Sequence, residues 1–156
     1  MKITATLLKF GEDSRADFFG DVVTFAPGSL YTDEHQAVPL LVETHDAGKV
    51  SAGVATSIWV DGDTVRGEFD LLDTFNGQQA ALELAAGVRR DVSIGVLPDA
   101  YDLQPIEDAE PHPVWGPPMR ATVTLADLYE VSLCFRGRMP SAQVDDVSTA
   151  TPEGEA

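Results

Sequence analysis

The sequence contains a single cysteine, Cys134, in 156 residues. One cysteine cannot form an intrachain disulfide, and it excludes zinc sites built from several cysteines. Cys134 lies in an apolar stretch, which favours a small buried side chain over a nucleophile. The chain also lacks a His-x-x-x-His pair, a phosphate-binding glycine loop and a dinucleotide fingerprint. We therefore expect no metal site and no cofactor.

Basic residues are scarce, with 10 Lys and Arg against 26 Asp and Glu and a net charge of −16. This charge argues against binding to nucleic acid or to an anionic membrane surface, and it is compatible with basic or polyampholytic protein partners. No apolar run approaches the ~20 residues that span a bilayer. The opening MKITATL is too short and too polar for a signal peptide. We expect a soluble protein that is made and used in a cytoplasm.

The sequence does contain a series of short strand patterns. The hydrophobic content of 44% and the two tryptophans indicate a globular chain, and its length suits one domain. Alternating or apolar runs predict strands over 3–10, 21–25, 38–44, 51–60, 64–71, 89–96 and 128–135. One helix is predicted over 74–87, where alanine and leucine are frequent and Gly87 suits a C-terminal cap. These elements predict a mainly β protein with one helix (α+β), built as a small closed β-barrel on which the helix packs.

Two segments are expected to lie outside regular structure. Residues 98–120 are rich in proline and carboxylates, and they predict a long surface loop or flap that contains His112. Residues 145–156 are acidic and mostly small, which predicts a disordered tail. The barrel domain is therefore expected over 1–144.

Ser93 is the first candidate for chemistry. In DVSIGV (91–96), apolar residues alternate with Ser93 and Gly95, so a strand places the serine on the face opposite the valines. Gly95 shares that face, and we interpret it as leaving the backbone approachable for a substrate chain. A serine of this kind is more often a core-edge residue. Its interest comes from a histidine upstream and a glutamate downstream.

The three histidines differ in their surroundings. His35 lies in a polar loop and His112 lies between two prolines, so both are expected to be exposed. His45 ends the apolar run VPLLVET (38–44), where a rigid strand can present its side chain at the barrel wall. An imidazole, with an ordinary pKa of ~6.5, can take the proton from a serine hydroxyl. We expect His45 to act as the base for Ser93.

An imidazole in this role needs an acceptor for its second nitrogen, which fixes the tautomer. Glu130 is one candidate, because it shares a face of LYEVSLCF (128–135) with Ser132 and Cys134, where an unpaired carboxylate is costly to bury. Glu68 is another, although on its hairpin strand it could also be a solvated residue. Spacing alone does not separate the two.

Three segments, in chain order, resemble the phage prohead (capsid maturation) proteases and the herpesvirus assemblins that share their fold. VPLLVETHD (38–46) resembles the apolar strand that ends in the catalytic histidine of this family. DVSIGV (91–96) resembles its Ser-[Ile/Val]-Gly strand, and LYEVSLC (128–134) resembles the phage Glu-Val-Ser-Leu strand. APGSL (26–30) is similar to the phage Ala-Pro-Gly-[Ala/Ser]-Phe stretch. Together the resemblance covers roughly residues 2–144.

The resemblance implies a serine endopeptidase on a barrel of the prohead protease type. It implies Ser93 as the nucleophile, His45 as general base and then acid, and Glu130 as the residue that orients His45. A Gly-Arg element follows the corresponding assemblin strand, and its offset matches Gly137 and Arg138, which implies Arg138 at the oxyanion site. The chain departs from the phage pattern after this strand, where RGRMP (136–140) replaces Pro-Ala-Asn-Pro, and in the length of its proline-rich segment.

The implied substrates are scaffold protein, major capsid protein and the chain itself, cut inside an assembling procapsid in the host cytoplasm. Assemblins gain activity on dimerisation, so a homodimer or higher oligomer is a further expectation. One alternative is a non-catalytic capsid-assembly or scaffold module on the same barrel, which Ser93→Ala would separate from a protease. The other is a small-ligand β-barrel, which a wide separation of Ser93 and His45 would favour.

Overall fold

The computed structural model describes residues 1–149, which form nine strands and one helix. The strands are β1 (Lys2–Lys9), β2 (Val22–Phe25), β3 (Leu30–Tyr31), β4 (Pro39–Val42), β5 (Gly53–Asp61), β6 (Thr64–Leu71), β7 (Asp91–Pro105), β8 (Met119–Cys134) and β9 (Gln143–Ser148), and the helix is α1 (Phe75–Ala85). The predicted strands and the predicted helix therefore form, most of them within a few residues of the expected bounds.

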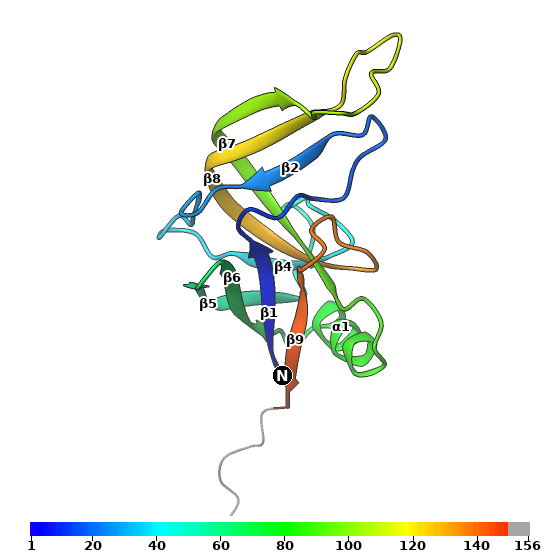
Figure 1. Cartoon of the computed structure of the whole chain (residues 1–156). Coiled ribbons are helices and arrows are strands. Elements are labelled where there is room, and N and C mark those ends of the chain that lie inside the picture. Colours follow the sequence, from blue (N-terminus) through cyan, green and yellow to red (C-terminus); the bar gives the residue numbers. More distant parts are fainter. Residues whose placement is uncertain (150–156) are drawn as a thin grey trace, which may run out of the picture.

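Seven of the described strands close into a barrel (Figure 1), in the order β8-β4-β5-β6-β1-β9-β7, with β7 pairing back to β8. The neighbours are antiparallel except β4 and β8, which run parallel. Alternate side chains point inward, as Ile3, Ala5 and Leu7 do on β1 and Val65 and Phe69 on β6. The closed barrel with one short helix confirms the predicted mainly β, α+β class.

The helix α1 lies against the barrel along one face, on which Gly77, Ala80 and Leu84 are buried. Thr74 caps its N-terminus by accepting a hydrogen bond from the Gly77 amide, and Gly87, with φ of 78°, follows its C-terminal end. A side chain at Gly77 would lie 1.9 Å from the carbonyl oxygen of Leu72, so only glycine permits this close approach. Leu84 is buried in the last turn. The part of the chain that the structure describes holds no helix with the length and apolarity that crossing a membrane requires.

The prediction that 98–120 forms a loop is wrong. β7 continues to Pro105 and β8 begins at Met119, and these two residues pair at the end of one antiparallel ladder. Only residues 106–118 connect the strands. The prolines were misleading because this part of β7 is an edge. At Pro98 and Pro105, β8 is the only described strand that pairs with β7. A proline has no backbone N–H, but here there is no second neighbouring strand that would lose a hydrogen bond.

The outer halves of β7 and β8 project beyond the barrel (Figure 1). β2 joins them by pairing in parallel with β8, from Val22 opposite Arg120 to Phe25 opposite Val123. We call this projection, residues 16–25 and 97–125, the arm. The same two strands therefore form part of the barrel wall at one end and the arm at the other.

The predicted disordered tail differs from the structure over its first residues. β9 runs to Ser148, which pairs with Lys2 of β1. The hydroxyl of Thr6 donates to the Asp145 carboxylate at 2.7 Å, and Arg66 approaches the same carboxylate at 3.4 Å. The barrel therefore extends to Ser148 rather than ending at 144, with the charge of Asp145 compensated by side chains of β1 and β6. The predicted tail from residue 150 onward lies outside the described residues.

Candidate active site

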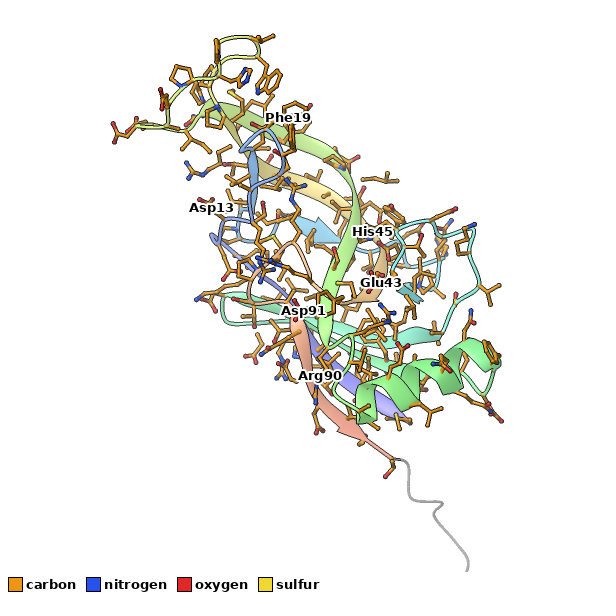
Figure 2. The ribbon with its side chains drawn as sticks, turned by 90° about the vertical axis from the view of Figure 1, so that its right-hand side faces the viewer. Asp13, Phe19, Glu43, His45, Arg90 and Asp91 are labelled. Carbon is orange, nitrogen blue, oxygen red and sulfur yellow. The ribbon has the colours of Figure 1, made fainter. Side chains whose placement is uncertain are left out.

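Three neighbouring strands, β7, β8 and β4, bring the predicted site residues together. Ser93 lies on β7, where Ser132 of β8 is its cross-strand partner, and Glu130 lies opposite Gly95 in the same ladder. His45 follows β4, which pairs with the other edge of β8. Figure 2 shows His45 beside β7, not far from the beginning of that strand at Asp91. The central position of β8 therefore places side chains from distant parts of the chain side by side.

Ser93, His45 and Glu130 form a continuous chain of contacts. The Ser93 hydroxyl oxygen lies 3.1 Å from Nε2 of His45, and Nδ1 of His45 contacts Oε1 of Glu130. With Glu130 ionised, Nδ1 carries the proton and donates it to the carboxylate, which leaves the Nε2 lone pair for the Ser93 hydroxyl. In this arrangement an imidazole can accept the hydroxyl proton.

Glu68, the other carboxylate considered for this position, lies elsewhere. It is on β6, where Lys2 approaches its carboxylate at 3.3 Å and the Thr56 hydroxyl donates to it at 3.0 Å. These partners belong to the barrel wall. The structure thus places Glu130, and not Glu68, against His45.

Glu130 is fully buried. Burial raises the pKa of Glu130 above its ordinary value, while the contact with His45 acts in the opposite direction. Its second oxygen, Oε2, has no hydrogen-bond partner among the described residues. The negative charge is therefore stabilised chiefly by His45, and a positive charge that develops on the imidazole would be favoured.

Gly95 makes room for this carboxylate. A side chain at Gly95 would place its Cβ 2.1 Å from Oε1 and 2.8 Å from Cδ of Glu130. The space left by the missing side chain is therefore filled by Glu130, although Gly95 itself lines the cleft beside Ser93, as the expectation of an approachable backbone requires. The signal for this role is the cross-strand register, which the sequence alone does not contain.

Two hydrogen bonds hold the backbone around His45. The Tyr129 hydroxyl donates to the His45 carbonyl oxygen at 3.1 Å, and the Thr44 amide donates to the Ser132 hydroxyl at 3.3 Å. Tyr129 and Ser132 flank Glu130 on β8 within two residues. Sequence reasoning missed both roles, although Ser132 was predicted to share the face of Glu130.

A third support begins at Glu43, just before His45. Glu43 has a positive φ of 52°, which is uncommon for a residue other than glycine. Its carboxylate accepts a hydrogen bond from the Phe135 amide at 2.7 Å and forms an ion pair with Arg89. Arg89, whose φ is 55°, also pairs with Glu83 of α1. The turn that leads to His45 is thus tied to both β8 and the helix.

The Ser93 and His45 side chains line a cleft of about 440 Å³. Its other lining residues are mainly apolar or aromatic and include Val23, Phe25, Ile94, Val96, Tyr129 and Met139. A hollow of about 590 Å³ beside α1 is larger, but neither Ser93 nor His45 lines it. The smaller cleft therefore contains the Ser93–His45 pair, and the larger hollow does not.

Arg138 also lines this cleft. The chain before it passes directly over β7, because a side chain at Gly137 would lie 2.5 Å from the Val92 carbonyl oxygen. The Arg15 amide donates to the Arg138 carbonyl oxygen at 2.8 Å, which fixes the backbone here. The guanidinium lies 3.9 Å from the Asp17 carboxylate. The predicted oxyanion residue is thus at the same cleft as the hydroxyl, with a positive charge.

The remaining candidates lie apart from these contacts. His35 and His112 are exposed, as expected. Cys134 is buried, and burial raises the pKa of its thiol to about 11, so the thiol is protonated at neutral pH and is a poor nucleophile. Within residues 1–149 there is no group of three or more His, Cys, Asp or Glu side chains arranged to hold a metal ion.

No family model, curated protein or solved structure matches the chain.

Proposed function

We propose that this chain is a serine endopeptidase in which Ser93 is the nucleophile, His45 the general base and acid, and Glu130 the residue that orients His45. The observation that carries the proposal is the unbroken line of contacts from the Ser93 hydroxyl through both ring nitrogens of His45 to the Glu130 carboxylate. A serine hydroxyl needs an adjacent base to react at neutral pH, and the base needs a group that holds its tautomer.

In the proposed reaction, Ser93 Oγ forms a bond to the carbonyl carbon of the scissile peptide while its proton passes to Nε2 of His45. The tetrahedral intermediate then expels the amine, which takes that proton, and leaves an acyl ester on Ser93. Water attacks the ester with His45 again as base, and the acid product leaves as the hydroxyl regains its proton.

Two charged groups support the polar steps. Glu130 is buried beside the imidazole and stabilises its protonated form. Arg138, at the cleft, is proposed to stabilise the oxyanion directly or through a water molecule. The apolar lining of the cleft suits a peptide with an apolar side chain next to the scissile bond.

The resemblance to prohead proteases and assemblins supplies the proposed substrates. They are scaffold protein, major capsid protein and the enzyme itself, cut during procapsid maturation in the host cytoplasm. The acidic surface of the chain is compatible with such protein substrates.

The test begins with a serine-directed fluorophosphonate probe, which reports nucleophilicity without a known substrate. Wild type should form one adduct on Ser93, located by mass spectrometry of the digest. Ser93→Ala should form none and keep the unfolding curve of wild type. Ser57→Ala, which alters an exposed serine of β5, is the matched control and should label normally.

Purified protein is then mixed with phage scaffold protein and major capsid protein. Their cleavage by wild type, and not by Ser93→Ala, is the expected result. Adduct formation without any cleavage would be consistent with a serine hydrolase, but it would overturn the proposal that scaffold and capsid proteins are the substrates. A folded wild-type protein that forms no adduct would overturn the proposal that the chain is an enzyme, and it would favour the non-catalytic assembly module.

A further inference from the structure

An exposed aromatic cluster lies at the outer end of the arm. Phe18 and Phe19 are 87% and 52% exposed, and Trp115 is 50% exposed. The Phe19 ring meets both Phe18 and Trp115 edge to face, with centroids 5.4 Å apart in each pair. Figure 2 shows Phe19 just below the 106–118 loop. The two loops border a hollow of about 580 Å³, which these rings help to line. Clustered exposed rings of this kind mark interaction sites on soluble proteins.

The loop of Trp115 is held in place by its own bonds. His112 and Gly116 exchange two backbone hydrogen bonds of 2.8 and 2.9 Å, and the His112 ring accepts a third from the Val114 amide. The His112 ring also stacks on Trp115 with their centroids 3.5 Å apart. The conformation of the rings is therefore set before any partner binds.

The loop of Phe19 is fixed to the same structure. The Asp17 carboxylate accepts hydrogen bonds from the amides of Phe19 and Asp21. The Asp21 carboxylate in turn accepts one from Met119 of β8 at 2.7 Å. Both sides of the hollow are thus ordered in the free protein, which lowers the entropy lost on binding.

The arm is also strongly acidic. Residues 16–25 and 97–125 contain seven carboxylates and one basic residue, Arg120. Arg120 is already engaged by the Asp13 carboxylate through two hydrogen bonds. Glu107, Asp108 and Glu110 are exposed in the loop and take part in no ion pair among residues 1–149. The aromatic hollow is therefore bordered by unneutralised negative charge.

We propose that this hollow docks a cationic polypeptide segment of a partner protein. An apolar side chain of the segment enters the hollow between the rings, and its Lys or Arg side chains pair with Glu107, Asp108 and Glu110. Exposed aromatic faces add a favourable interaction with such cations. Electrostatic repulsion disfavours three other partners for this hollow: nucleic acid, an anionic bilayer and a second copy of this chain, whose net charge is −16. The proposal does not depend on the reactivity of Ser93.

The probe is a short fluorescein-labelled peptide in which leucine residues are flanked by lysines. Fluorescence anisotropy at about 0.1 M salt, where charges remain partly unscreened, should give saturable binding to wild type. The same peptide with glutamate in place of lysine should not bind. The peptide with serine in place of leucine should bind at least about tenfold more weakly, because the apolar anchor is lost.

Paired variants locate the binding. Phe19→Ala with Trp115→Ala should weaken it at least about tenfold, whereas Trp59→Ala with Phe75→Ala, which removes the same ring types from the barrel and α1, should change it less than about twofold. All four side chains are exposed to some degree, so the variants are expected to fold, and circular dichroism checks this.

A second pair of variants tests the charges. The arm variant carries Glu107→Gln, Asp108→Asn and Glu110→Gln, in which asparagine suits the positive φ of 61° at position 108. The control removes three exposed carboxylates of the barrel and its loops by Glu34→Gln, Asp61→Asn and Asp63→Asn. Only the arm variant should lose affinity, again by at least about tenfold. Equal loss in both variants would show non-specific attraction and would overturn the proposal. Absence of wild-type binding, or direct binding of labelled duplex DNA or anionic vesicles to the protein without the peptide, would overturn it as well.

Discussion

Replacing Gly95 by alanine tests how the three site residues are assembled. The new Cβ would lie 2.1 Å from Oε1 of Glu130, the oxygen that contacts His45. Real Cβ atoms essentially never approach within 3.0 Å, so the carboxylate, or the strand that carries the new Cβ, must move and widen this distance by at least 3.0 − 2.1 = 0.9 Å. Glu130 is fully buried, and it cannot swing into solvent to relieve the contact.

The expected loss of reactivity follows from this displacement. A shift of about 1 Å in a group that positions catalytic residues costs about 10²-fold in rate. Overpacking also costs stability, typically about 1–3 kcal/mol. We therefore expect Gly95→Ala to react with the fluorophosphonate probe about 10²-fold more slowly, while most molecules remain folded.

A second crowded glycine supplies the control for overpacking. The Cβ of Gly67→Ala on β6 would lie 2.8 Å from the Phe69 ring and would touch none of the site residues. This variant should lose comparable stability in urea unfolding but react with the probe at the wild-type rate. Labelling is measured under conditions in which both variants are folded by circular dichroism.

Two results would refute the reasoning. A folded Gly95→Ala that labels as fast as wild type would mean that the position of Glu130 does not matter to Ser93. Equal slowing in Gly95→Ala and Gly67→Ala would mean that loss of packing, and not displacement of the carboxylate, controls the rate.

Three further predictions concern Glu130, Arg138 and Cys134. Glu130→Gln keeps the shape of the side chain but removes its charge, and we expect it to slow labelling by about 10⁴-fold. Burial raises the pKa of Glu130 in the folded state, so the folded state binds the carboxyl proton more tightly than the unfolded state does. The protonated carboxyl therefore contributes stability below the unfolded pKa, and this contribution is lost as pH rises through the folded pKa. Urea unfolding of Glu130→Gln as a function of pH should lack this decline, and an unchanged pH profile would contradict the assignment. Arg138→Met should slow peptide cleavage by about 10²-fold if the guanidinium stabilises the oxyanion. Arg136→Met is the control and should cleave at the wild-type rate. Equal rates for the two variants would exclude a role of Arg138 at the oxyanion. Cys134, whose thiol pKa is raised by burial to about 11, should resist a disulfide reagent in the native protein and react once urea unfolds it, so rapid native reaction would contradict its burial.

Most of the strands and the helix could be predicted because their signals are local, whereas β3 and β9 were not predicted. Alternation of apolar residues marks β1 and β6, and alanine and leucine mark α1. Closure of the barrel could not be assigned strand by strand, since Lys2 pairs with Ser148 and no local pattern links them. Composition misled in two places, because prolines on the arm and carboxylates on β9 occur in strands with partners or solvent to accommodate them.

The site was predictable in its residues and not in its assembly. Ser93 and His45 stood out because each occurs at a strand position that can present a side chain. The choice between Glu130 and Glu68 depends on which strand lies between β7 and β4, and that neighbour is β8. The role of Gly95 depends on its cross-strand partner. Both facts belong to tertiary structure, which spacing along one chain does not contain.

The β7–β8 ribbon carries Ser93 and Glu130 at its barrel end and the aromatic hollow at its other end. Register shifts after Gly95 and again around Ala100 separate these ends, and such bulges absorb local changes in strand geometry. Insertions and exchanges at the exposed 106–118 tip would therefore leave the chemistry undisturbed. Natural selection, or an engineer who grafts a different tip, could alter the surface offered to a partner while keeping the same arrangement of Ser93, His45 and Glu130.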